Sequence, residues 1–319
     1  MKEIGGYIEL ERNTMPMLHE EALALNCGSN CLAYLLRARK IKVLWIPYFL
    51  CNCVKDTCHK EGTTVYFYEI NSDFTPRIEA ELRSDEWLYV VNFYGQLTEE
   101  QIERIVQLHQ RVIIDNAQAY FNKPLNGVDT LYTCRKFFGV PDGAFLYTNA
   151  QLNETLSRDM SFERMRFLLG RFEQPASDFY EEYVKNNDAL SEEPIKTMSR
   201  LTENLLRGID FDRVRCVRTN NYHCLNQRLK RINLLKPREI EGAFAYPLLV
   251  ENGAELRRKL LQEKIYIPTL WPNVLELRGS LESYYAENIL PLPCDQRYGQ
   301  EDMLKIIDAL ERFLCIELV

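Results

Sequence analysis

The sequence lacks the features by which several classes of protein are recognised. No apolar run approaches the ~20 residues of a membrane-spanning helix, so we expect no membrane partner. Acidic residues outnumber basic ones by 46 to 39, which gives a formal net charge of −7. A nucleic-acid-binding protein needs a basic face, so we expect no nucleic-acid partner. Residues 1–13 lack the apolar core of a signal peptide, which predicts a cytoplasmic protein.

Motifs for metal and nucleotide binding are also missing. The four histidines are scattered and form no HExxH pattern, so we expect no bound metal. Neither Cys27/Cys31 nor Cys51/Cys53 is a CxxC motif, and neither has a second pair at zinc-ligand spacing. We expect the ten cysteines to be reduced and mostly buried. A GxGxxG motif is absent as well, which makes a plain Rossmann-type nucleotide-binding protein the weakest interpretation.

From residue 29 to 148 the sequence alternates between helical and strand patterns. Apolar spacing and end signals predict helices at 29–40, 52–62, 75–83 and 98–110, the last with Thr98 as its N-cap. Short apolar runs predict strands at 42–47, 63–70, 86–95 and 111–115. This alternation predicts an α/β fold with a mostly parallel central sheet and flanking helices. Ligands bind such sheets at the carboxyl ends of the strands.

After residue 150 the strand signal fades. Helical patterns cover 157–187, 195–210 and 211–232. The end of the chain is mixed, with predicted strands at 242–250 and 265–268 and predicted helices at 252–264 and 299–315. We therefore expect a large domain at 1–195 and a smaller α+β C-terminal domain at 196–319.

Two positions in the first half suggest a bound anion and a buried acid. Gly28 and Ser29 stand at the start of a helical pattern, where backbone N–H groups and the helix dipole can bind an anion. The alternative is an ordinary helix cap. Asp115 ends an apolar strand, where a carboxylate needs a cationic or N–H partner, unless it is only a turn residue.

A third position supplies an amine. Lys136 lies between two apolar runs, after Arg135 and before a glycine-containing turn. A lysine beside a cation loses proton affinity and can form a Schiff base with a carbonyl. The alternative is a surface lysine in a hairpin. Together the three positions offer an anion site, an acid for a ring nitrogen and an amine for an aldehyde, which are the groups that pyridoxal 5′-phosphate (PLP) requires.

Segments 46–70, 112–120, 133–148 and 288–307, in this order, resemble the DegT/DnrJ/EryC1/StrS family of sugar aminotransferases. The resemblance implies a fold-type I PLP-dependent transferase, with the cofactor bound covalently to Lys136. It further implies that Asp115 faces the pyridine nitrogen, that Gln118 contacts the ring face or hydroxyl, and that the phosphate is bound by Gly28, Ser29, Asn30 and Thr133. The residue that stacks on the ring is one of Tyr48, Phe49 and Cys51, with Phe49 as our candidate. The family's serine five residues before the lysine is Leu131 here, and loops that would read a sugar nucleotide do not match clearly.

The leading interpretation is a PLP-dependent aminotransferase that moves an amino group, with glutamate as the expected donor, to a keto group of a nucleotide-linked sugar. Two alternatives stay open: a PLP enzyme that acts on a non-sugar amino or keto substrate, and a non-catalytic binding protein that retains the fold. The family resemblance also implies a homodimer. The apolar residues of segment 161–172 agree with an interface, although a helix buried within its own subunit would look the same.

Overall fold

The computed structural model describes residues 4–315 and contains, within that range, an eight-stranded sheet of order β1-β8-β7-β6-β5-β2-β3-β4. Strands β3, β2, β5, β6 and β7 are parallel, while β1, β8 and β4 run antiparallel to their neighbours. The predicted mostly parallel sheet is therefore confirmed. The strands are β1 Leu23–Leu25, β2 Val43–Pro47, β3 Thr64–Ile70, β4 Pro76–Arg77, β5 Trp87–Val91, β6 Val112–Asp115, β7 Asp129–Thr133 and β8 Ala144–Tyr147.

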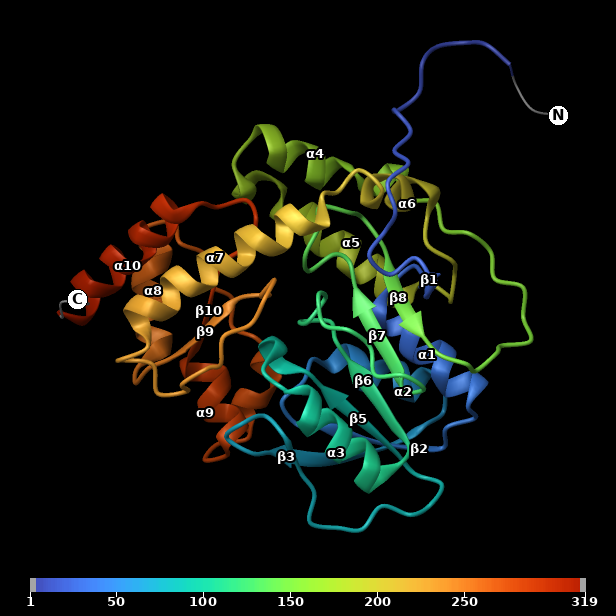
Figure 1. Cartoon of the computed structure of the whole chain (residues 1–319), viewed down its shortest axis with the longest axis horizontal. Helices are drawn as coiled ribbons and strands as arrows, with labels where there is room; N and C mark the ends of the chain where they lie inside the picture. Colours follow the sequence, from blue (N-terminus) through green and yellow to red (C-terminus); the bar gives the residue numbers. More distant parts are fainter. Residues whose placement is uncertain (1–3, 316–319) are drawn as a thin grey trace.

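Helices cover both faces of the sheet. The crossovers β2–α2–β3 and β5–α3–β6 run in opposite directions along the sheet, so right-handed connections place their helices on opposite faces. Figure 1 shows this arrangement, with α1 packed beside α2 and α3 packed on β6. These helices are α1 Gly28–Ala38, α2 Asn52–Lys60 and α3 Glu99–His109.

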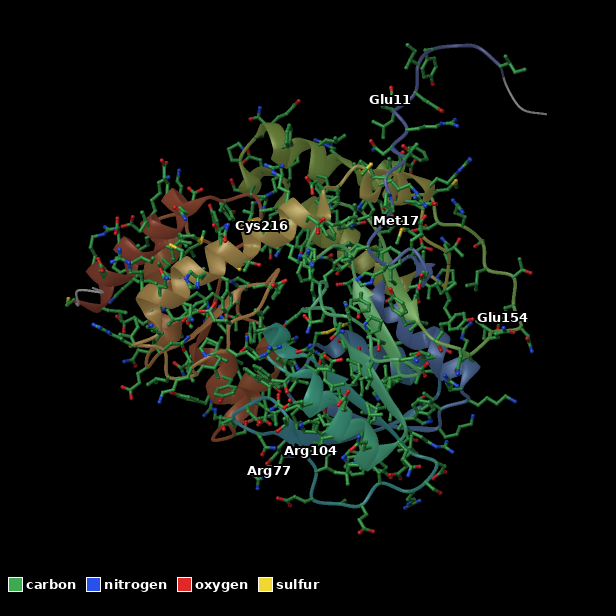
Figure 2. The ribbon with its side chains drawn as sticks, in the orientation of Figure 1. Glu11, Met17, Arg77, Arg104, Glu154 and Cys216 are labelled. Carbon is green, nitrogen blue, oxygen red and sulfur yellow. A yellow bond between two sulfur atoms is a disulfide. The ribbon has the colours of Figure 1, made fainter. Side chains whose placement is uncertain are left out.

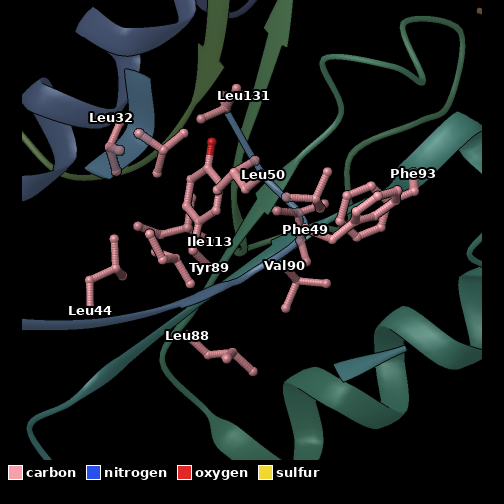
Figure 3. Packing of buried hydrophobic residues seen from close by; sticks show 14 of the residues in the cluster. Leu32, Leu44, Phe49, Leu50, Leu88, Tyr89, Val90, Phe93, Ile113 and Leu131 are labelled. Atoms are coloured by element: carbon pink, nitrogen blue, oxygen red, sulfur yellow. The ribbon is translucent and has the colours of Figure 1, made fainter. Parts of the chain in front are cut away.

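The core lies between the sheet and these helices. Strands β5 and β6 are buried over nearly their whole length, as expected for parallel strands that are covered on both faces. Figure 3 shows Leu44 and Ile113 from neighbouring strands on the same side of the sheet as the Tyr89 ring, with Leu32 of α1 nearby, while Leu88 points away from that ring. The apolar runs that predict the strands thus form the core between the eight-stranded sheet and its helices.

Helix α3 begins as predicted at Thr98. The Thr98 hydroxyl accepts a hydrogen bond from the Gln101 N–H at 3.1 Å, and Gln101 Oε1 accepts one from the Thr98 N–H at 2.9 Å. This capping box satisfies two backbone donors of the first helical region.

The rest of the chain is mainly helical and has a second core. Tyr222, Leu248, Leu290 and Met303 are fully buried in this core. The elements after residue 150 are α4 Arg166–Glu173, α5 Tyr180–Glu192, α6 Arg200–Leu206, α7 Phe211–Leu229, β9 Tyr246–Leu249, α8 Gly253–Gln262, α9 Leu281–Asn288, β10 Ile289–Leu292 and α10 Gln300–Leu314, with 3₁₀ turns at Phe162–Arg164, Ala176–Phe179 and Pro272–Glu276. One further 3₁₀ turn, Phe93–Gly95, follows β5 in the first half of the chain. Helix α7 belongs to both parts of the chain, since Val214 packs on the β7–β8 side and Tyr222 in the second core. The domain boundary at 195/196 stays a prediction.

Two predicted elements are wrong. Segment 75–83, predicted as a helix, contains only the two-residue strand β4, which pairs antiparallel with β3. Segment 265–268, predicted as a strand, is not in a strand or helix. In the first case Pro76 and only two large apolar side chains in nine residues, Ile78 and Leu82, give too little buried surface to stabilise a helix.

The N-terminal segment approaches the body of the molecule from outside. Figure 2 shows Glu11 on the extended part and Met17 where the chain reaches the body. Met17 packs against the cluster that contains Tyr120 and Phe145. Across residues 4–315, no helix combines the length and the apolar character needed to cross a bilayer.

The structure corrects one expectation about the cysteines. Cys51 and Cys53 form a disulfide at the start of α2 instead of remaining reduced. The other eight cysteines are free, and five of them are buried: Cys27, Cys31, Cys58, Cys134 and Cys294.

Candidate active site

The predicted site residues lie at the carboxyl end of the parallel strands. Asp115 is the last residue of β6 and pairs with Leu131 of β7. Strand β7 ends at Thr133, and the chain then turns through Lys136 before it returns as β8. Because β6 and β7 are parallel, their ends bring Asp115 and the Lys136 turn to the same edge of the sheet.

Asp115 is a buried carboxylate with two neutral donors. Its Oδ2 accepts a hydrogen bond from the Tyr89 hydroxyl at 2.9 Å, and its Oδ1 accepts one from the Ala117 N–H at 2.7 Å. Burial raises the pKa of Asp115 above its ordinary value, while the Lys136 charge and these two donors oppose the rise. A nearby cationic group would therefore stabilise the ionised carboxylate.

Lys136 lines a cleft of about 1150 Å³ between the α4–α5 region and the C-terminal region. Its side chain reaches solvent there, and its ammonium lies 5.9 Å from the Phe244 ring centroid. Closely surrounding protein nevertheless removes much of its water, and this burial lowers the pKa of Lys136. Asp115 raises that pKa and Arg135 lowers it further. The balance favours the neutral, nucleophilic amine more than in an ordinary lysine.

The N-terminus of α1 adjoins the end of β7. A Cβ atom on Gly28 would lie only 2.7 Å from Thr133 Cγ2, so the two residues are in contact. The N-cap residue Cys27 makes no side-chain cap, and the first turn holds no acidic residue. The free N–H groups in the first turn of α1 and the positive end of the helix dipole are therefore available to an anion.

Two polar atoms beside this helix end have no partner. Thr133 Oγ1 and Arg135 Nε are both buried and make no hydrogen bond. The Arg135 guanidinium binds the Asn187 side chain through Nη2, and its charge acts on Cys27 at the cap of α1. Buried polar atoms are normally paired, so these two are suited to a ligand that brings acceptor atoms.

Ser29 and Asn30 occupy the second and third positions of α1. The Asn30 side-chain amide donates to Asn26 Oδ1 and to the Pro194 carbonyl, both at 2.9 Å. It can therefore offer an anion only its backbone N–H, whereas Ser29 keeps a half-buried hydroxyl at the helix end.

Gln118 and Phe49 are both buried. Gln118 Oε1 accepts a hydrogen bond from the Tyr94 N–H at 2.8 Å. The Phe49 ring has no exposed surface and packs against Phe93 and Trp271, with centroid distances of 5.3 and 4.5 Å. Figure 3 shows Phe49 and Phe93 side by side. The cofactor contacts of Gln118 and Phe49 stay predictions.

Sequence reasoning missed several polar residues of the site. Tyr89 lies in the apolar run of β5, where its hydroxyl was the one signal of a buried polar partner. Arg218 and Gln296 are distant in sequence from Lys136, and no local pattern marks them. Among residues 4–315, no cluster of three or more His, Cys, Asp or Glu side chains is arranged to hold a metal ion.

By sequence, the chain matches no known protein family and no curated protein. By structure, it is similar to a DegT DnrJ EryC1 StrS aminotransferase from Brucella abortus, with 17% identity, a TM-score of 0.63, and coverage of 92% of this chain and 85% of that chain. It is also similar to DesV from S. venezuelae in complex with a ketimine intermediate, with 20% identity, a TM-score of 0.63 and coverages of 92% and 84%.

A third similar structure is ntda from Bacillus subtilis with bound cofactor PMP, with 12% identity, a TM-score of 0.65 and coverages of 91% and 72%. Low identity combined with coverage of most of each chain establishes a shared fold. This chain has the fold of the DegT/DnrJ/EryC1/StrS aminotransferases, which confirms the fold class expected from the sequence.

Proposed function

We propose that this protein is a PLP-dependent aminotransferase. The observation that carries the proposal is the convergence of three groups at one sheet edge: the Lys136 amine, the Asp115 carboxylate, and the α1 N-terminus with the unpaired Thr133 hydroxyl. Each matches one part of the cofactor, namely its aldehyde, its ring nitrogen and its phosphate. The fold of the solved aminotransferases supports the same conclusion.

The residues present fit the cofactor. Gly28 leaves room that a Cβ would fill, and the unpaired Thr133 Oγ1 and Arg135 Nε can donate to phosphate oxygens beside the helix N-terminus. Asp115 would hold a proton on the ring nitrogen through its buried carboxylate. When bound, PLP supplies a ring that withdraws electrons from the substrate's α-carbon. Lys136 would bind the aldehyde carbon and later accept and return a proton at that α-carbon.

The cleft beside Lys136 favours an anionic substrate. Its lining contains more basic than acidic side chains, although the whole chain carries a net charge of −7. Besides Lys136, the basic residues are Arg135, Arg171, Arg218, Lys264, Arg297 and Lys305, and the acidic ones are Asp295 and Asp302. A nucleotide-linked keto sugar as amino acceptor, and glutamate as donor, agree with this charge. A non-sugar keto acid would also be anionic and is the second candidate.

We further propose that the protein acts as a homodimer. Its cytoplasmic location stays a separate prediction. Phe162, Leu169 and Phe172, around and within α4, are 67%, 61% and 92% exposed. Large apolar side chains grouped in this way are typical of an interface, and the cleft of Lys136 continues to Phe172.

The cofactor can be tested directly on purified protein. We expect a visible absorbance band after incubation with PLP, and we expect borohydride reduction to abolish the band. Mass spectrometry of the reduced protein should find the adduct on Lys136, and Lys136→Ala should carry none. An adduct on another lysine in the wild-type protein would overturn the assignment. Bleaching of the band by glutamate, followed by recovery with a nucleotide-linked keto sugar or with a keto acid, would identify the substrate class.

A further inference from the structure

The residue directly after Lys136 is held by two side chains from distant parts of the sequence. The Phe137 carbonyl oxygen accepts hydrogen bonds from Gln296 Nε2 at 2.7 Å and from Arg218 Nη2 at 3.0 Å. Arg218 lies on α7, and Gln296 lies between β10 and α10. Two donors engage both lone pairs of this carbonyl and fix the orientation of its peptide.

The other side of Phe137 is also fixed. Its N–H donates to the Cys134 carbonyl at 3.0 Å, which closes a turn around Arg135 and Lys136. The Lys136 backbone is therefore anchored at the end of β7 on one side and by Arg218 and Gln296 on the other.

The Arg218 side chain is committed to this contact. Its Nε donates to Gln296 Oε1 at 2.7 Å, and its Nη1 donates to the Ala243 carbonyl at 2.8 Å. Its guanidinium lies 4.6 Å from the Phe137 ring centroid, and the residue is only 1% exposed. These hydrogen-bond partners are all neutral. A buried cation of this kind is costly, and an apolar pair would stabilise the fold at least as well.

Both side chains also line the cleft that contains Lys136. One pair of residues thus contacts the space where a substrate would lie and fixes the backbone beside the amine. Small displacements of a reacting group reduce rates strongly, so a fixed backbone at this position has a direct use.

We propose that Arg218 and Gln296 are positioning residues that set where the Lys136 amine stands in the cleft. The chemical role of the Lys136 amine rests on the proposed function, whereas its position in the cleft does not. Releasing the Phe137 carbonyl would let the Lys136 turn move outward, away from Asp115 and toward solvent.

The chain offers a matched control. Arg238 also links the C-terminal region to the part of the chain that contains the eight-stranded sheet. Its guanidinium donates hydrogen bonds to the backbone carbonyls of Gly95, Gln96 and Leu97 at 2.8–2.9 Å. It holds a different loop and does not contact the Lys136 turn. Arg238→Lys should therefore weaken the link between the two parts of the chain without moving Lys136.

The first experiment uses cofactor-free protein. Trace acetylation with acetic anhydride over a range of pH, followed by peptide mass spectrometry, reports the pKa of the Lys136 amine. In Gln296→Leu and in Arg218→Lys, we expect this pKa to rise toward its ordinary value, because burial is the main cause that lowers it. Arg238→Lys should keep the wild-type value.

The second experiment follows the growth of the visible band after mixing with PLP. We expect the rate to fall roughly tenfold to a hundredfold in Gln296→Leu, and to remain unchanged in Arg238→Lys. If Gln296→Leu lowers the melting temperature but leaves the pKa and the rate at wild-type values, the pair is only structural and the proposal is wrong. If the wild-type protein forms no band, the proposed function fails, while the acetylation result still decides the positioning role.

Discussion

Asp115, the last residue of β6, and Asp129, the first residue of β7, are both buried carboxylates, and their partners differ. Asp129 accepts two hydrogen bonds from the Arg39 guanidinium, at 2.8 and 2.9 Å, and its charge is thereby balanced. Asp115 has only the neutral Tyr89 hydroxyl and the Ala117 N–H in contact. The pairing of Asp129 is typical of a structural carboxylate, whereas Asp115 is suited to a cationic ligand.

Asp115→Asn should keep the fold and bind PLP but react slowly with an amino donor. The neutral amide cannot hold the proton on the ring nitrogen, and the loss should be about a hundredfold or more. Stopped-flow bleaching of the visible band by glutamate measures this rate. Asp129→Asn is the control and should lower thermal stability without slowing the bleaching. Wild-type rates in Asp115→Asn would mean that Asp115 is only a turn residue.

His19 should make the protein acid-sensitive. Its Nε2 contacts the Tyr120 carbonyl at 2.9 Å and its Nδ1 the Tyr147 hydroxyl at 3.0 Å, an arrangement that suits the neutral ring with its proton on Nε2. Burial lowers the pKa of His19 from 6.5 to about 4. The unfolded chain therefore binds a proton more readily, and the stability that His19 contributes is complete above pH 6.5 and is lost as the pH falls to about 4.

The expected loss is about 3 kcal/mol of unfolding free energy between these two pH values. Urea unfolding of cofactor-free protein at pH 7.5, 5.5 and 4 measures it. His19→Gln keeps a donor and an acceptor but cannot titrate, so its stability should fall less over this range. Parallel curves for the two proteins would contradict the assignment.

At the scale of elements, a substitution at the start of α1 can distinguish a cofactor phosphate site from an ordinary helix cap. Gly28→Val should place its side chain against Thr133 and fill the space where the N–H groups face outward. We expect PLP affinity, measured by equilibrium dialysis, to fall at least about tenfold, or ~1.4 kcal/mol. The loss of thermal stability, measured as the melting temperature of cofactor-free protein, should be proportionally smaller than the loss of PLP affinity. Gly299, the N-cap residue of α10, has open space around it and provides the control Gly299→Ala.

Elements with strong local signals were predictable, and those that depend on distant contacts were not. The buried strands β5 and β6 are continuous apolar runs, and Thr98 marks the start of α3 through its own hydrogen bonds. Segment 75–83 has a weak apolar pattern, and pairing of β4 with the edge of β3 decides its structure. Lys136, Asp115 and Gly28 could be proposed as a site because strand ends and helix starts follow from local pattern. Arg218 could not, since its partners lie 25 to 81 residues away.

At the scale of the whole molecule, we expect a dimer that uses the apolar side chains around α4. Stable interfaces of this kind commonly bury more than about 2,000 Å², so the dimer should persist in light scattering of dilute protein. Phe172→Asp should weaken it. Leu108→Asp, on α3 at a different part of the surface, is the control, since Leu108 is also largely exposed. A monomer that still binds PLP and transfers amino groups would refute the dimer.

The hydrogen bond from Gln296 to Phe137 has a consequence for how the protein is made. Its two ends are 159 residues apart, so a ribosome that has just added Phe137 still needs roughly ten to thirty seconds to reach Gln296. The sheet and the lysine turn emerge first, and the side chains that hold the turn emerge later. A nascent chain halted before residue 296 therefore has the Lys136 turn without one of the two side chains that hold it. We expect such a chain to form the PLP adduct more slowly than a chain that extends beyond residue 296.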